Sequence, residues 1–483
     1  MKKNILLILG IFILCGCNIV NSSSKDMTST DSSSSTGGQI VTSSHVSTKD
    51  EVSSSSKVVN SSQSQATSNE SSHSSIQKQK GFIYDENDLI NIKNDLSQNY
   101  YLANDIILTK NWNVIGDDDN PFSGIFDGNG YTIQNLNIDS LLSITQKSVT
   151  TGIDYSSVGG LFGKVTGTVK NLKLKNYNIS ISNQTINKNV NTANSEYKIF
   201  VGGIAGINKG NIIDCEADGN INVGSSHLIA RGRLGGLVGK NDGTIDHCSS
   251  SGEIRTTFTY ENVRVGGLVG ASEGGVIKRS FSNTSINAVN NNGKAIIGGL
   301  VGLVEFSNIE NCYATGDIEA KSNKAATAGG LIGLIDATIS GTTLISNSYA
   351  NNKITTTATE RSSYSGGIVG NCEVLISGSS LVGNVTIINC FYLGDGIYST
   401  ARNKAHGGMV ISCIEGNSNF HTITITNCLY IANIEMSVKG TVESKKNSQG
   451  TKVASIQEIY NKISLDANIW TFNSTSSEYP ILK

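Results

Sequence analysis

Proline is almost missing from this chain: there are 2 prolines in 483 residues, against 52 glycines. A glycine-rich chain with so little proline is neither collagen nor a stiff linker. An excess of one charge is missing too, since 37 basic and 39 acidic side chains leave a net charge of −2. Nucleic acid is therefore not an expected partner, because its binding needs a basic face. No run of 18 apolar residues occurs, so no segment has the length of a membrane-spanning helix.

The motifs of common enzyme sites are also missing. The chain has neither a His-Glu-x-x-His zinc motif nor a Gly-x-Ser-x-Gly nucleophile motif, and no phosphate-binding loop. We therefore name no catalytic residue and expect no cofactor. The six histidines lack metal-ligand spacing: His45, His73, His227, His247, His406 and His421.

The first residues have the pattern of a secretion signal. Lys2 and Lys3 precede an apolar run of about ten residues from Ile5 to Leu14, which is too short for a permanent membrane span. The run ends in Leu14-Cys15-Gly16-Cys17, which resembles a bacterial lipobox. The resemblance implies a signal peptide over 1–16 and diacylation of Cys17. The acyl chains would then attach the protein to the membrane. The alternative is an ordinary signal peptide that is cut nearby.

Residues 17–80 have the composition of a flexible tether. Between Asn21 and Lys80 there are 23 serines in 60 residues, with few apolar side chains and no aromatic ones. Such a segment buries too little surface to offset its backbone entropy, which predicts disorder. An r.m.s. span of roughly 40–45 Å follows for a flexible chain of this length.

The rest of the chain repeats a Gly-Gly-aliphatic-x-Gly segment at steps of 31 to 43 residues. Ser123-Gly124-Ile125-Phe126 is an earlier, divergent copy. Repeats at such a period indicate stacked structural units that cover each other's buried faces. The second glycines of the copies are Gly160, Gly203, Gly236, Gly267, Gly299, Gly330, Gly367 and Gly408.

A second element follows each first one and contains an Asn-Cys-type pair, such as Asn311-Cys312. Apolar residues two and six positions after the Cys have a period of two, which predicts a strand with one buried face. The isoleucine three positions before the Cys breaks this period, so we expect a bend at the Asn, which tolerates left-handed backbone. In the two early copies this pair is Asn135-Leu136 and Asn171-Leu172.

These patterns predict an all-β fold: a parallel, right-handed β-helix of about nine coils with about three strands per coil. The repeats occupy residues 123–445. An N-terminal cap over 81–122 contains a short amphipathic helix from Asp85 to Ser97. A C-terminal cap over 446–483 contains a helix from Ile456 to Ile463, with Trp470 and residues 479–482 covering the last coil.

The Gly-Gly-Leu-Val-Gly motif and the following Gly-x-Ile-x-Asn-Cys resemble the GLUG repeat. This repeat occurs in bacterial cell-surface proteins and in the non-catalytic region of IgA1-specific zinc metallopeptidases. The resemblance covers about residues 81–483. It implies a β-helix of the pectate-lyase-like kind, a surface location and, more loosely, adhesion or matrix binding. It does not carry over protease activity, because the zinc motif is absent.

Two groups of charged residues are candidate sites. Asp117, Asp118 and Asp119 form an acidic loop whose carboxylates would suit calcium, although a solvated turn explains them equally simply. A basic cluster on one face would suit a polysaccharide-active enzyme, and solvated loop charges are the favoured alternative. The basic residues are Arg231, Arg233, Arg264, Lys278 and Arg279.

Six cysteines occupy matching positions on consecutive repeats. Neighbouring coils would bring each pair near the Cα separation that a disulfide needs, and a surface protein would allow oxidation. Small buried thiols filling a narrow corner are the favoured alternative. The pairs are Cys215/Cys248, Cys372/Cys413 and Cys390/Cys428.

The sequence favours a surface-anchored lipoprotein with a non-catalytic binding or adhesion domain, contacting glycans or matrix and surface proteins. A tethered repeat without a catalytic constellation suits that function. Two alternatives stay open: a polysaccharide lyase or hydrolase on one face of the β-helix, and a structural envelope protein without a specific ligand.

Overall fold

The computed structural model describes most of the chain that follows the serine-rich segment. The predicted signal peptide (1–16), Cys17 and the predicted tether up to residue 77 lie outside the described residues. In the described part, no helix is long and apolar enough to cross a membrane. The described ranges are 78–148, 152–182, 197–228, 230–338, 340–374, 383–416, 422–447, 449–471 and 479–483.

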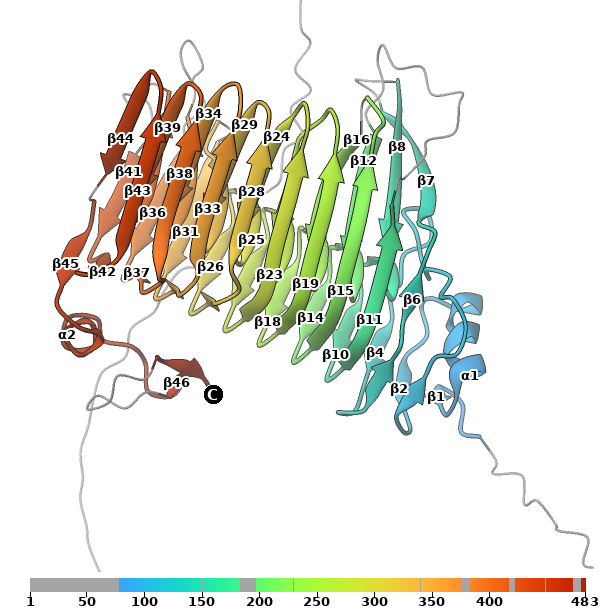
Figure 1. The fold of residues 1–483 in the computed structure, drawn as a ribbon. Helices are drawn as coiled ribbons and strands as arrows, with labels where there is room; N and C mark the ends of the chain where they lie inside the picture. Colours follow the sequence, from blue (N-terminus) through green and yellow to red (C-terminus); the bar gives the residue numbers. More distant parts are fainter. Residues whose placement is uncertain are drawn as a thin grey trace, which may run out of the picture. The chain divides into compact units, whose positions relative to one another are not determined.

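The repeats form a parallel β-helix, in which each strand pairs with the equivalent strand of the next coil (Figure 1). Each coil passes through four sheets, so the prediction of three strands per coil is wrong; in the later coils the sixteen-stranded sheet receives two short strands in place of one. The Gly-Gly pair explains the difference, because it ends one strand at a corner and a separate strand begins after it. Eight successive coils contribute to all four sheets.

Two of the sheets meet at the Gly-Gly corner. The ten-stranded sheet starts with β7 and β8, which pair antiparallel and so limit one open edge. Its strands are β7 (Leu142–Ser148), β8 (Gly152–Gly159), β12 (Tyr197–Gly202), β16 (Ala230–Gly235), β20 (Val263–Gly266), β24 (Lys294–Gly298), β29 (Ala325–Gly329), β34 (Ser362–Gly366), β39 (Lys404–Gly408) and β44 (Glu443–Asn447). The eight-stranded sheet contains β9 (Phe162–Val165), β13 (Ala205–Asn208), β17 (Val238–Asn241), β21 (Val269–Glu273), β25 (Val301–Glu305), β30 (Ile332–Asp336), β35 (Val369–Glu373) and β40 (Ile411–Glu415).

The other two sheets meet at the Asn-Cys bend. The eleven-stranded sheet contains β1 (Phe82–Ile83), β2 (Tyr100–Leu102), β4 (Ile125–Asp127), β10 (Thr168–Lys170), β14 (Asn211–Ile213), β18 (Thr244–Asp246), β22 (Val276–Lys278), β26 (Asn308–Glu310), β31 (Gly341–Ser346), β36 (Gly383–Ile388) and β41 (Thr422–Thr426). The sixteen-stranded sheet contains β3 (Ile106–Ile107), β5 (Thr132–Gln134), β6 (Asn137–Ile138), β11 (Lys173–Ile181), β15 (Glu216–Ser225), β19 (Ser249–Phe258), β23 (Phe281–Asn290), β27 (Tyr313–Ala314), β28 (Ile318–Ser322), β32 (Tyr349–Ala350), β33 (Lys353–Ala358), β37 (Phe391–Tyr392), β38 (Gly396–Ala401), β42 (Leu429–Ile431), β43 (Glu435–Gly440) and β45 (Thr451–Val453).

The predicted column of second glycines is confirmed for the central coils, but at both ends of the stack the glycines are one residue out of register. At the first coil Gly159 pairs with Val201, one residue out of step. In the last coil Gly408 pairs with Gly366, so the residue in register with Gly367 is Met409 and not Gly408. The prediction that Ser123 begins a copy of the Gly-Gly segment is wrong as well. Ile125 pairs with Thr168 of β10, so this segment belongs to the eleven-stranded sheet before the Asn-Cys bend and not to the Gly-Gly corner. The column consists of Gly203, Gly236, Gly267, Gly299, Gly330 and Gly367.

The predicted bend is confirmed, and its residues adopt left-handed backbone. The side chains there are mostly Asn or Asp, which tolerate positive φ. Asn135 is not part of this set, because it lies beside Asn176 at a second bend, where Asn176 Nδ2 donates to Asn135 Oδ1. In the coil of Asn135, the residue in register with Asn171 is Gly130. The bend residues, with φ of 48–54°, are Asn171, Asp214, His247, Arg279, Asn311, Asn347, Asn389 and Asn427.

Both predicted helices are present, and the N-terminal one is shorter than predicted. α1 (Glu86–Ile90) begins at Asp85, whose carboxylate accepts a hydrogen bond from the Asp88 amide, and it continues as a 3-10 turn over Asn91–Asn94. Leu89 and Ile92 are fully buried. α2 (Ile456–Lys462) is capped in the same way by Ser455.

The C-terminal segment does not cover the last coil as predicted. It lies along the outer face of the sixteen-stranded sheet, where Trp470 packs on Tyr313 and Tyr349 (ring centroids 6.2 and 6.0 Å apart). The Tyr349 hydroxyl donates to Pro480 O (2.7 Å). An outward-facing aromatic stack explains this placement, because the segment buries it. The stack is Phe281, Tyr313, Tyr349 and Phe391, with neighbouring centroids 4.7–5.1 Å apart.

Candidate functional site

The outer faces of the ten- and eight-stranded sheets form a joint surface, called here the corner face. In β20, Val263 and Val265 belong to the core, so Arg264 between them points outward. Outward residues should be exposed, yet Ile296 of β24 and Leu303 of β25 are at most 1% exposed. They are buried because they pack together with Ala271 and Leu334 in a small outer cluster. The two outer faces therefore contact each other beside the Gly-Gly corner.

One edge of the corner face is a column of carboxylates, called here the acidic column. Its members occupy equivalent positions on six successive coils, and equivalent residues of neighbouring strands lie about 4.8 Å apart. Sequence reasoning missed this column, although five of its six members stand seven residues after the first glycine of their coil, and Glu415 stands eight residues after Gly407. The members are Asp242, Glu273, Glu305, Asp336, Glu373 and Glu415.

Basic and aromatic side chains of the ten-stranded sheet face the acidic column. Arg233 pairs with Glu273 (2.7 Å), and Lys294 reaches Glu373 (2.9 Å). The Tyr364 hydroxyl donates to the carboxylate of Glu415. These contacts join strands of different sheets, so they hold the two outer faces together and neutralise part of the acidic column.

Neighbouring carboxylates of the column differ in protonation. Burial would raise the pKa of Glu273, but Arg233 and Lys240 outweigh it and hold the pKa below its ordinary value. Burial, and then the charges of Glu273 and Asp336, raise the pKa of Glu305 to about 7. Near neutral pH the column therefore places a half-protonated carboxyl next to an ionised one.

Several polar atoms of the corner face are buried without a hydrogen-bond partner. They include Arg264 Nε, Arg233 Nε, Asn371 Oδ1 and both ring nitrogens of His406. A buried polar group without a partner costs about 1–3 kcal/mol, so native proteins keep few of them. His406 Nε2 also lies 3.6 Å from Glu443 Oε1. Because these groups lack hydrogen-bond partners and share one outer face, that face is the candidate site for a ligand.

We predict that Glu305→Gln stabilises the protein at alkaline pH. The folded state retains a proton up to about pH 7, whereas the unfolded chain releases it near 4.5, so stability falls as pH rises between these values. The variant has no such loss and should be more stable by about 1–2 kcal/mol at about pH 8, a value reduced for solvent screening. Near pH 4 both proteins should unfold alike.

Denaturant unfolding at both pH values measures this difference, with Glu360→Gln in an exposed loop as the matched control. Equal stability of Glu305→Gln and the parent protein at about pH 8 would contradict the raised pKa.

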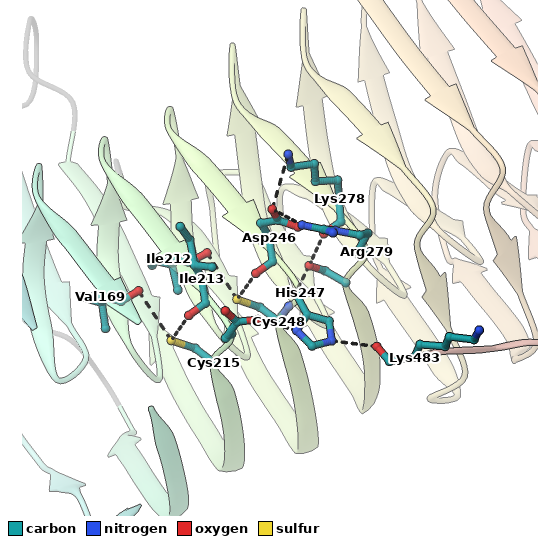
Figure 2. Close-up of polar contacts among 12 residues, drawn as sticks. Val169, Ile212, Ile213, Cys215, Asp246, His247, Cys248, Lys278, Arg279 and Lys483 are labelled. Atoms are coloured by element: carbon teal, nitrogen blue, oxygen red, sulfur yellow. Dashed lines mark hydrogen bonds and ion pairs between the residues drawn. The ribbon is translucent and has the colours of Figure 1, made fainter. Parts of the chain in front are cut away.

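The predicted basic cluster divides between two places. Arg231, Arg233 and Arg264 lie on the corner face, where Arg231 pairs with Glu261 (3.2 Å). Lys278 and Arg279 lie at the Asn-Cys bend instead, and both pair with Asp246 (Figure 2). The favoured alternative of loop charges is therefore wrong for these three arginines, because Arg231 and Arg233 belong to β16 and Arg264 belongs to β20.

The bend region contains a hollow of about 220 Å³. It lies between the bend residues and the end of the chain, since His247 contacts both Asp214 Oδ1 (2.5 Å) and Lys483 O (2.9 Å) (Figure 2). Arg279 and Leu482 also line it. Its polar groups contact each other, so it serves to hold the C-terminal segment.

The predicted calcium ligands do not converge. Asp117 accepts the amides of Asp119 and Asn120 within its own turn (3.0 and 2.7 Å), and Asp118 pairs with Lys164 (2.6 Å). Throughout the described ranges, no group of three His, Cys, Asp or Glu side chains is placed to hold a metal ion. The turn and the ion pair account for the acidic loop.

The described cysteines are all free thiols. Cys215 and Cys248 are buried at equivalent positions, and their Sγ atoms donate to backbone carbonyls, including Ile213 O (3.2 Å) and Asp246 O (3.3 Å) (Figure 2). Burial raises the pKa of Cys248 well above its ordinary value, which keeps the thiol protonated. Cys390 and Cys428 have the same arrangement.

The predicted Cys372/Cys413 pair is wrong. Cys413 pairs in register with Asn371, and Cys372 pairs with Ile414. Cys372 therefore points into the core while Cys413 faces outward, because successive side chains of a strand alternate. The one-residue shift at Gly408 is the cause.

A family model described as "The GLUG motif" matches residues 230–255 and 295–319. The chain carries GLUG motifs. Each matched segment runs from the ten-stranded sheet through the Gly-Gly corner and past the Asn-Cys bend, so a GLUG motif corresponds to most of one coil. The GLUG motif therefore supplies both the corner and the outward positions of the corner face.

Solved structures similar to this chain include proteins with IgA1 protease names. One, a candidate immunoglobulin A1 protease from Bacteroides ovatus, is 17% identical, with 83% of this chain and 91% of that chain covered and a TM-score of 0.39. Another, an IgA1 protease, is 17% identical with a TM-score of 0.35, over 72% of this chain and only 21% of that chain. No curated protein matches the chain.

Proposed function

We propose that the protein is a bacterial surface lipoprotein, anchored through Cys17, whose β-helix binds an extended glycan along the corner face without cleaving it. The observation that carries this proposal is the set of buried, unpartnered polar groups on that face. Arg233 and Arg264 lie on two neighbouring coils, and Asn371 and His406 lie on two neighbouring coils further along the stack. An extended polymer rich in hydroxyl groups would satisfy both groups at once.

The absence of a metal cluster in the described part of the chain gives no support to the metallopeptidase chemistry of the GLUG-containing proteases. A surface protein or matrix protein is the other ligand class, and it would have to enter the same corner face. The glycan is favoured because the unpartnered groups are polar and the apolar cluster beside them is already buried.

The test uses the full-length chain with immobilised polysaccharides and matrix proteins, scoring retention and polymer chain length together. We expect retention on a polysaccharide whose length does not change. Replacing Asn371 and His406 by Ala should abolish retention, whereas replacing His227 and the exposed Asn384 by Ala should not. Retention on proteins alone would exclude the glycan, and retention on nothing would favour a structural envelope role.

A second candidate function is hydrolysis or elimination on the same polysaccharide. Its support is the difference between Glu273, whose pKa is lowered, and Glu305, whose pKa is raised to about 7. One ionised and one protonated carboxyl side by side is an arrangement that acid–base catalysis uses. Shortened polymer, with the shortening lost in Glu305→Gln, would establish this function in place of binding alone.

The anchor has a separate test. Replacing Cys17 with Ala should move the protein from the membrane fraction to the medium, because two acyl chains are needed for stable attachment. Continued membrane attachment of the variant would exclude lipidation at Cys17.

A further inference from the structure

Arg264 is a largely buried, charged side chain of the corner face that meets no partner among the described residues. It makes no hydrogen bond and no ion pair, and its Nε is buried. The desolvation of a charged group is costly unless it is paired, so a structural guanidinium would have found a counter-ion. Arg264 lies on β20 between Arg233 in the preceding coil and Ile296 in the next.

The nearby carboxylates are engaged elsewhere. Glu273 is held by both Arg233 (2.7 Å) and Lys240 (2.8 Å). Asp336 accepts the amide of Thr338 (3.0 Å). Glu305 retains a proton up to about neutral pH because its pKa is about 7. Glu273 and Glu305 act on the positive charge of Arg264 only through space, and neither makes a hydrogen bond or an ion pair with it.

We propose that Arg264 is an anion subsite that binds the carboxylate or sulfate groups of an acidic polysaccharide. A guanidinium presents a planar fork of donors that matches the paired oxygens of either group. Arg233 stands beside it in register and repels it in the free protein. An anion between the two would relieve this repulsion. This inference rests on the proposed function and narrows its ligand to polymers that carry negative charge.

The experiment measures binding of the full-length chain to three soluble probes: polygalacturonate, dextran sulfate and uncharged dextran. We expect one or both anionic polymers to bind and dextran not to bind. Arg264→Met retains the stem but removes the donors, so affinity for the anionic polymer should fall at least about tenfold. Arg264→Lys, which retains the charge, should retain part of the affinity.

Arg255→Met is the matched control, because Arg255 is 68% exposed on the outer face of β19 and pairs with Glu253 (2.7 Å). Thermal unfolding gives a second readout. Removing an unpartnered buried charge should raise the unfolding temperature of Arg264→Met above that of the parent protein. Lost binding together with gained stability is the signature of a ligand site, which a structural role would not produce.

Three outcomes would overturn the subsite: unchanged affinity in Arg264→Met, an equal loss in Arg255→Met, or a lower unfolding temperature in Arg264→Met. Binding of dextran alone would overturn the subsite and leave the proposed glycan binding intact. Binding of none of the probes, with retention on no other polysaccharide, would remove the proposed function itself.

Discussion

Gly298→Ala is expected to destabilise the β-helix by about 3–5 kcal/mol. Gly298 is the first glycine of its coil, and a Cβ atom there would overlap the carbonyl oxygen of Val301 and lie 2.7 Å from the amide nitrogen of Gly333. Both neighbours are backbone atoms of the corner, so they cannot move aside as a flexible side chain would. The added methyl group would force apart two coils in the middle of the stack.

Equilibrium unfolding in denaturant measures this loss. Gly130→Asn is the control, because nothing lies within 4 Å of its Cβ position and Asn tolerates the positive φ of +81° found there. The control should change stability by less than about 1 kcal/mol. A cost that small for Gly298→Ala would mean that the corner accepts a side chain, contrary to the geometry.

Trp470→Ala is expected to release the C-terminal segment from the β-helix, at a local cost of about 3–5 kcal/mol. Trp470 is 1% exposed, packs on Tyr313 and Tyr349, and donates from Nε1 to Asn311 Oδ1 (3.2 Å). The segment adds two short strands, β46 (Trp470–Thr471) and β47 (Ile481–Leu482), which pair only with each other among the described strands. Its attachment therefore depends on this apolar contact.

Hydrogen exchange with peptide resolution distinguishes local release from global unfolding. Amides of α2 and β46 should exchange faster in Trp470→Ala, while those of the central coils should keep their protection. Tyr479→Ala is the control, since Tyr479 belongs to the same segment and is 44% exposed. Unchanged protection of α2 in Trp470→Ala would show that other contacts hold the segment.

The repeat unit was predictable because its causes are local. The period of two after each Cys identified the buried strand face, and the odd offset before it located the left-handed bend later found at Asn311 and its equivalents. The acidic column was also present in the sequence, since five of its six members stand seven residues after the first glycine of their coil. It is hard to recognise there because its members are a mixture of Asp and Glu and because the last Gly-Gly pair is one residue out of register with the others.

The sequence by itself determined that this chain forms a parallel β-helix with a glycine corner and an Asn bend in each coil. Steric limits on the backbone and the alternation of strand side chains act within a few residues, so the pattern records them directly. Only the tertiary structure decided which outward side chains meet. Arg264 and Glu305 are 41 residues apart, and Trp470 contacts Tyr313 across 157 residues.

Such contacts depend on the register between coils and on the angle at which two sheets meet. A shift of one residue moves a side chain to the opposite face of its strand, as the separation of Cys372 from Cys413 shows. That register is set by the summed packing of the whole stack, which no single repeat contains.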